Sequence, residues 1–168
     1  MNGRPERSQR SWRSEGEVWH ALVVPGYRTG SHTKHRLQYH LVWIPKYRKR
    51  VLIGRVASRL KRLFYEAASV NRWAIHELSV QRDHVHILIQ MGPDMSVARA
   101  VQLLKGGTSF KLRKEFPELE EFLWGDSFWA DGYFAESVGT TQEEMVRKYI
   151  RDQENDDQSM PKARSPGL

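Results

Sequence analysis

Two histidines near the middle of the chain are spaced so that their imidazoles could share a metal ion. They lie in the run Asp83-His84-Val85-His86-Ile87-Leu88-Ile89, whose β-branched and apolar residues predict a strand. Residues two apart on a strand face the same side, so we expect His84 and His86 to project together, with Cα atoms about 7 Å apart. The alternative interpretation of the pair alone is two strand histidines that are hydrogen-bonded on a solvated face.

A predicted helix near the C-terminus carries side chains that could complete such a site. Thr141 and Glu144 form a capping box that predicts the start of this helix. Tyr149 and Gln153 are four residues apart on it and therefore share a face. The amide oxygen of Gln153 could be a third metal ligand, and a phenol beside two histidines would make a coherent catalytic set. The alternative for Tyr149 is a half-buried aromatic residue of an amphipathic helix.

The remaining hydrophobic pattern predicts an α+β fold. It predicts strands at 35–44, 73–80 and 83–89, helices at 55–71 and 96–116, and short aromatic strand segments at 127–129 and 132–135. Ser96 can cap the second helix, and Gly106-Gly107 interrupt it at a cost of about 1 kcal/mol each. This order indicates a ferredoxin-like (RRM-like) antiparallel sheet with helices on one face, plus a C-terminal catalytic helix.

Length and composition bound the organisation of the chain. Its 168 residues suit one domain with a hydrophobic core. We expect a flexible basic N-terminal extension at 1–30, the folded domain at 31–158 and a disordered tail at 159–168. The absence of cysteine excludes disulfides and thiolate metal sites. No apolar run approaches the roughly 18 residues of a membrane span, and no signal peptide is recognisable, so we expect a cytoplasmic protein.

The net charge of +7 is concentrated in one part of the chain. Between Val18 and Tyr65 there are many lysines and arginines and no acidic residue. A patch of one sign gains free energy by releasing counterions from phosphates, which favours a nucleic-acid partner over a plain solvated face. The basic loop 46–50 also carries Tyr47, on which a base could stack, although a solvated turn is the alternative. The candidate DNA-binding residues are Lys34, Arg36, Lys46, Arg48, Lys49, Arg50 and Lys105.

Five ordered segments of the chain resemble a known family, the single-tyrosine HUH transposases (histidine, hydrophobic residue, histidine) of the TnpA type. That family belongs to small bacterial and archaeal insertion sequences. The segments are His40-Leu41-Val42-Trp43-Ile44-Pro45-Lys46-Tyr47-Arg48, Asp83-His84-Val85-His86, Leu103-Leu104-Lys105-Gly106, Gly132-Tyr133-Phe134 and Arg147-Lys148-Tyr149-Ile150. The resemblance covers roughly residues 37–153. The first thirty residues and the tail after Gln158 depart from the compact form of the family.

The resemblance implies a transposase that cuts and transfers single-stranded DNA, such as hairpins at insertion-sequence ends. His84 and His86 match the metal-binding histidines of the family, Tyr149 matches its nucleophile, and Gln153 matches the helix residue that completes the metal shell. The family works as a homodimer, in which the tyrosine helix of one subunit can serve the histidines of the other. Gly139 precedes that helix and is placed for such a hinge.

The residues suit this chemistry in their own right. A phenol with a pKa near 10 is a poor nucleophile at neutral pH and needs help. A divalent ion held by His84, His86 and Gln153 can polarise a phosphate oxygen and orient the scissile bond for in-line attack. Tyr149 would then form a 5′-phosphotyrosine and release a 3′-OH, which could later reseal the strand without ATP. Such a ligand set suits Mn²⁺ better than Mg²⁺, although cellular supply can make Mg²⁺ the working ion.

Three other functions fit parts of the sequence. A domesticated HUH nuclease of the replication-initiation or relaxase type would use the same residues on other DNA. A non-catalytic RRM-like module would bind nucleic acid by aromatic stacking, without metal dependence or a covalent product. A metal-binding regulatory protein would use the histidines but would leave the basic segment unexplained.

Overall fold

The computed structural model of the chain describes residues 26–30, 32–121 and 127–159. It divides into two units, Met1–Arg36 and Leu37–Leu168. In the first unit, β1 (Arg28–Thr29) pairs antiparallel with β2 (Lys34–His35). The predicted boundary after residue 30 would therefore cut this hairpin. Residues 1–25 of the predicted extension and 160–168 of the predicted tail lie outside the described residues.

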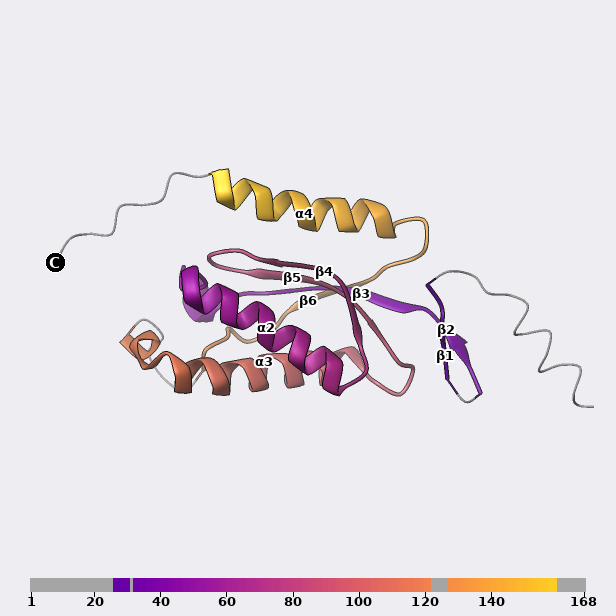
Figure 1. Cartoon of the computed structure of the whole chain (residues 1–168), viewed down its shortest axis with the longest axis horizontal. Helices are drawn as coiled ribbons and strands as arrows, with labels where there is room; N and C mark the ends of the chain where they lie inside the picture. Colours follow the sequence, from indigo (N-terminus) through magenta and orange to yellow (C-terminus); the bar gives the residue numbers. More distant parts are fainter. Residues whose placement is uncertain (1–25, 31, 122–126, 160–168) are drawn as a thin grey trace, which may run out of the picture. The chain divides into compact units, whose positions relative to one another are not determined.

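The second unit is built on a four-stranded antiparallel sheet with the strand order β4-β5-β3-β6 (Figure 1). The strands are β3 (Leu37–Trp43), β4 (Ala74–Val80), β5 (Val85–Met91) and β6 (Phe134–Ser137). The first and third strands of the unit are thus the inner pair, which is the arrangement of a ferredoxin-like fold. The predicted fold class is confirmed.

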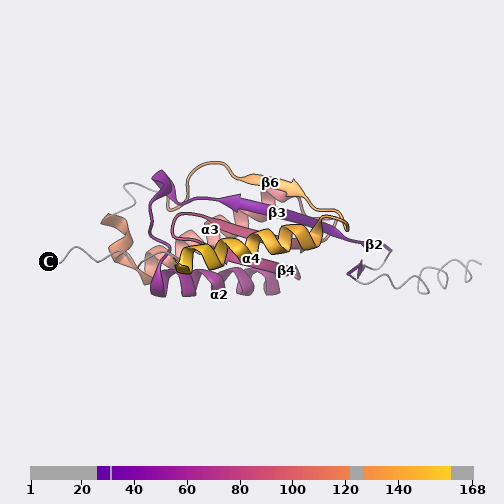
Figure 2. The ribbon, with the colours of Figure 1, turned by 90° about the horizontal axis from the view of Figure 1, so that it is seen from above.

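Helices cover both faces of this sheet (Figure 1, Figure 2). On one face lie α2 (Gly54–Val70) and α3 (Val97–Glu115), and on the other α4 (Glu143–Ser159) packs along β4 and β5. Two short 3₁₀ helices, η1 (Lys46–Arg48) and η2 (Pro117–Glu121), complete the unit. Among the described residues, no helix combines the length and the apolar character needed to cross a bilayer.

The sequence of β5 explains why the sheet has a layer on each side. Val85, Ile87 and Ile89 are fully buried in the main core, together with residues of α2 and α3. The alternate residues His86 and Leu88 are buried too, and Leu88 packs in a second, smaller cluster with residues of α4. A strand that is covered on both faces reads as a continuous apolar run, with little alternation.

The starts of two helices test the predicted caps. Ser96 caps α3, because its hydroxyl accepts a hydrogen bond from the backbone N–H of Arg99 at 3.2 Å. The capping box predicted at Thr141 is wrong. The first helical bond of α4 runs from the N–H of Val146 to the carbonyl of Gln142, which makes Gln142 the N-cap.

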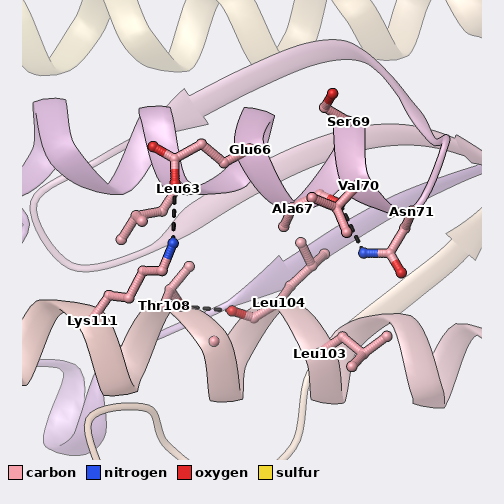
Figure 3. A pocket seen from close by; sticks show the side chains of 11 residues that line it. Leu63, Glu66, Ala67, Ser69, Val70, Asn71, Leu103, Leu104, Thr108 and Lys111 are labelled. Atoms are coloured by element: carbon pink, nitrogen blue, oxygen red, sulfur yellow. Dashed lines mark hydrogen bonds and ion pairs between the residues drawn. The ribbon is translucent and has the colours of Figure 1, made fainter.

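The two glycines inside α3 face open space. A Cβ added to Gly106 or Gly107 would meet no atom within 4 Å, so packing within the described chain does not require glycine there. Gly107 borders a groove of about 560 Å³ between α2 and α3 (Figure 3). The ion pair between Lys111 and Glu66, at 3.1 Å, spans this groove.

Candidate active site

Three histidines gather where β3 and β5 run side by side. His86 on β5 lies next to His84, and their ring centroids are 5.0 Å apart with planes at 77°. His40 on β3 lies on the other side of His86, with ring centroids 5.2 Å apart and planes only 16° from parallel. The two-residue spacing therefore does place His84 and His86 together. His40 adds a third ring that was not among the predicted site residues.

The two buried histidines share one hydrogen bond. Nε2 of His40 and Nδ1 of His86 are 3.0 Å apart. Burial, together with the charges that His84 and His40 can carry, lowers the pKa of His86 to about 4. Burial also lowers the pKa of His40, against the opposing charge of Glu136. Both rings are therefore neutral near pH 7, so one must donate and the other must accept.

The third histidine is held by a carboxylate. Nδ1 of His84 lies 2.6 Å from Oδ1 of Asp83, and Nε of Arg48 donates to the other oxygen of Asp83 at 2.9 Å. Burial alone would raise the pKa of Asp83, but the hydrogen bonds and charges of His84 and Arg48 outweigh it and lower the pKa. Asp83 therefore stays ionised, so its Oδ1 can accept a hydrogen bond from Nδ1–H of His84.

These contacts leave Nε2 as the coordinating atom of both His84 and His86. Metal-ligating histidines usually bond their second ring nitrogen to a carboxylate or another acceptor; here Nδ1 of His84 lies beside a carboxylate and Nδ1 of His86 lies beside the ring of His40. The pair therefore fits a divalent ion. Within the described ranges, no group of three or more histidine, aspartate or glutamate side chains is arranged to hold a metal. A third protein ligand would have to be of another type, such as the amide of Gln153, which is half-buried on α4.

Tyr149 lies beside the histidines of its own chain. Its ring is edge-on to His86, with centroids 5.6 Å apart, and edge-on to His40 at 6.1 Å. The side chain is 48% exposed, so solvent and a polymeric substrate can reach it. The sequence left open whether the tyrosine would serve its own subunit or a partner. In this conformation Tyr149 lies beside the histidines of its own chain.

An apolar contact holds α4 in this place. Ile150 is fully buried against Leu88 of β5 and Val138, with Val146 packed beside them. Ile150 follows Tyr149 directly in the helix. The side chain of Ile150 is buried against the sheet, whereas that of Tyr149 is partly exposed beside it. The register of this small cluster therefore fixes where the phenol lies along the sheet.

Polar contacts add to the docking of α4 on β4. Nη2 of Arg147 donates to Nδ1 of His76 at 3.0 Å, and Nε2 of His76 lies 2.8 Å from the amide oxygen of Gln90. His76 thus joins α4 to the sheet. Further along the helix, Glu154 pairs with Lys61.

Replacing Ile150 by alanine is expected to loosen α4. Removing three buried carbons should weaken the docking of the helix by about 2–5 kcal/mol, because the small cluster has few other members to refill the space. Native-state hydrogen exchange of the α4 amides measures this change. Met145→Ala on the same helix is the matched control, since Met145 is 67% exposed and should shift exchange by less than about 0.5 kcal/mol. Equal effects of the two substitutions would contradict this account.

The predicted DNA-binding turn is exposed and conformationally strained. Tyr47 and Arg48 both adopt the left-handed region, with φ of 59° and 51°. The ammonium of Lys46 lies 5.4 Å from the centre of the Tyr47 ring. Lys49 and Arg50 are exposed at the end of the turn. Four cationic side chains and an aromatic ring are therefore presented within one turn, although Arg48 is also engaged by Asp83.

The other candidate DNA-binding residues are placed differently. Nζ of Lys105 donates to the carbonyls of Ala130 at 2.7 Å and Gly132 at 3.0 Å, so this ammonium holds the segment before β6. Burial lowers the pKa of Lys105, against the opposing charge of Asp131. Lys34 and Arg36 belong to the first unit, Met1–Arg36, and are half-buried.

Part of the acid-free basic segment is neutralised by the fold. Arg59 makes two hydrogen bonds to Glu115, at 2.7 and 2.9 Å, and one to Glu66. The bonds to Glu115 join α2 to α3, and all three bonds engage a cation from the basic stretch that predicted a nucleic-acid partner. The stretch that carries only positive charges in the sequence therefore lies partly beside acidic side chains in the structure.

Known proteins match the chain over most of its length. Residues 33–153 match the family model described as "Transposase IS200 like". The ISDra2 transposase TnpA of Deinococcus radiodurans is 34% identical over 119 residues, which cover 71% of this chain and 85% of that protein. The transposase for insertion sequence element IS200 of Salmonella typhimurium is 29% identical over 127 residues, covering 76% and 83%.

Solved structures give the same picture. A protein from Deinococcus radiodurans described as a transposase superposes with a TM-score of 0.63 and 31% identity, over 75% of this chain and 97% of that one. A REP-associated tyrosine transposase bound to a REP hairpin superposes with a TM-score of 0.55, over 76% and 74%. At 10% identity, the second likeness concerns the fold alone.

Proposed function

The chain belongs to the IS200-like transposase family, and we propose that it cleaves and rejoins single-stranded DNA through a 5′-phosphotyrosine on Tyr149. The observation that carries the proposal is the position of this half-exposed tyrosine, whose ring lies 5.6 Å from that of His86. A phenol and two imidazoles whose Nδ1 atoms are each engaged in a hydrogen bond lie together on the sheet, and the amide of Gln153 lies about one helical turn further along α4.

The side chains divide the work of the reaction. Tyr149 Oη attacks the phosphorus and loses its proton, the P–O3′ bond breaks, and the departing 3′ oxygen takes up a proton. His84, His86 and Gln153 would hold a divalent ion, Mg²⁺ or Mn²⁺, which would polarise a phosphate oxygen as a Lewis acid. Asp83 and Arg48 keep the His84 ring oriented. Because the ester bond is exchanged for another ester, a 3′-OH can later reverse the step without ATP.

The exposed turn at 46–50 supports a DNA partner. Lys46, Lys49 and Arg50 would contact phosphates, and Tyr47 offers a ring for stacking. The transposase of similar fold was solved bound to a REP hairpin, which is consistent with a hairpin at an insertion-sequence end as the substrate here. Lys105 is a weaker candidate, because its ammonium is already bonded to two carbonyls.

A homodimer is also part of the proposal. β6 is an outer strand of the sheet, all four of its residues are exposed, and Phe134 is 53% exposed. An exposed edge strand with an aromatic side chain favours association with another chain. Gly139 lies in the link before α4, an added Cβ there would meet no atom within 4 Å, and glycine adopts a wider range of backbone angles than other residues. This supports a helix that can serve either its own subunit or the partner.

The proposal is tested by trapping the covalent product. Single-stranded oligonucleotides that carry hairpins from the DNA flanking the gene are incubated with protein and Mn²⁺ and run on a denaturing gel. A 5′-phosphotyrosine retains the downstream fragment, so a label at the 3′ end should shift with the protein. A label at the 5′ end should appear in a shorter free fragment. Binding without any adduct would favour the RRM-like module, and an adduct only on unrelated DNA would favour a domesticated nuclease.

A further inference from the structure

His40 is buried against His86 and has no role in the proposed ligand set. Its Nε2 lies 3.0 Å from Nδ1 of His86, and the two ring planes are only 16° from parallel. Near-parallel planes with nitrogens at this distance are the geometry of a bond that lies in the plane of both rings. Two neutral imidazoles can form such a bond in one of two ways, because only one proton lies between them.

The direction of this hydrogen bond decides whether His86 can bind a metal. If His40 donates, Nδ1 of His86 is the acceptor, the His86 proton sits on Nε2, and that atom has no lone pair for a cation. If His86 donates from Nδ1, its Nε2 lone pair is available. His40 must then carry its own proton on Nδ1 and accept through Nε2.

The two proposed metal ligands are thus held by different kinds of acceptor. His84 is held by the ionised carboxylate of Asp83, which is paired with Arg48 at 2.9 Å. The side chain of His40 is buried on β3, with the ring of Tyr149 edge-on to it. A carboxylate there would have to be desolvated, whereas a neutral imidazole can accept a hydrogen bond from Nδ1–H of His86 without burying a charge.

We propose that His40 is a positioning residue whose Nε2 accepts a hydrogen bond from Nδ1–H of His86, which leaves the Nε2 lone pair of His86 available to the metal. This inference rests on the proposed function, because it assigns His40 to the metal site of that reaction. His40 touches neither the ion nor the DNA; it acts through His86 alone.

The test compares two substitutions of nearly equal size. His40→Gln places an amide oxygen near the position of Nε2 and keeps an acceptor for His86. His40→Met has the same length and fills the same space, but it lacks an oxygen or nitrogen acceptor. A purely structural role for His40 would make the two variants alike. Thermal unfolding establishes that both variants are folded before they are compared.

The first readout is the proton position in the metal-free wild-type protein. Long-range ¹H–¹⁵N NMR spectra distinguish a protonated from an unprotonated ring nitrogen. We expect His86 to be protonated at Nδ1 in the wild type and in His40→Gln, and at Nε2 in His40→Met. A wild-type His86 protonated at Nε2 would overturn the inference, and this measurement requires no variant to fold.

The second readout is the affinity for Mn²⁺ without DNA, measured from the electron paramagnetic resonance signal of the free ion. His40→Met should bind about 10–100-fold more weakly than the wild type, and His40→Gln should lie within about threefold of it. Equal weakening in both variants would overturn the inference. If the wild type forms no covalent adduct, the proposed function fails separately, while the tautomer measured by NMR still decides the role of His40.

Discussion

Tyr149→Phe is expected to abolish the covalent protein–DNA adduct and to leave DNA binding unchanged. Removing a nucleophile usually costs at least about 10³-fold in rate, because no other group at the site can form the same bond. The phenylalanine ring keeps the edge-on contacts to His86 and His40, so α4 should remain docked. The adduct is counted on a denaturing gel and binding is measured by mobility shift.

Tyr47→Phe is the matched control for this substitution. Tyr47 is also an exposed tyrosine, but it lies in the turn at 46–50 and not beside the histidines. Its replacement should leave the adduct at the wild-type level for a substrate at saturating concentration. An adduct that survives in Tyr149→Phe would remove Tyr149 from the role of nucleophile, whatever the control does.

His84→Ala is expected to eliminate metal-dependent cleavage. Loss of one of two imidazole ligands should reduce the rate in Mn²⁺ by at least about 10²-fold, since a bound ion supplies several kcal/mol of transition-state stabilisation. Wild-type protein in excess chelator should show the same defect. Single-turnover cleavage of a labelled oligonucleotide measures both effects.

The control for this prediction is an exposed histidine away from the site. His32 lies between β1 and β2 in the first unit, and His32→Ala should cleave at the wild-type rate. DNA binding of His84→Ala should persist, because the substitution lies outside the turn at 46–50. Asp83 would lose its hydrogen bond with His84 but keep its ion pair with Arg48 of that turn. Undiminished cleavage in chelator would contradict a metal-assisted mechanism.

Local patterns predicted the parts of the site that lie within single elements. The spacing of His84 and His86 placed two rings together because strand geometry fixes which side chains are neighbours. The spacing of Tyr149 and Gln153 placed two side chains on one helix for the same reason. Neither pattern could say that this helix would dock on the histidine face, which depends on the burial of Ile150 against Leu88.

Contacts between distant segments account for what was missed. His40 is forty-six residues from His86 in sequence, and the two meet only because β3 pairs with β5. A signal for it did exist, since His40 alternates with the core residues Leu41 and Tyr39 and must face the other side of its strand. The partners of Arg59 and Lys105 could not be predicted for a similar reason, because the carboxylate of Glu115 and the carbonyl of Ala130 come from other parts of the chain.

The second hydrophobic cluster has a thermodynamic consequence. If α4 left the sheet, Leu88 and Ile150 would be wetted together, so a vacant docking face would be costly. Reciprocal exchange of α4 between two identical chains, as in domain swapping, would restore the buried contact of Ile150 with Leu88 in both copies. The swapped and unswapped states would then differ in free energy only through the strain in residues 138–142 and the contacts between the copies. The activation barrier would govern how often the helices exchange between the chains, and the linker strain and the contacts between the copies would set the equilibrium.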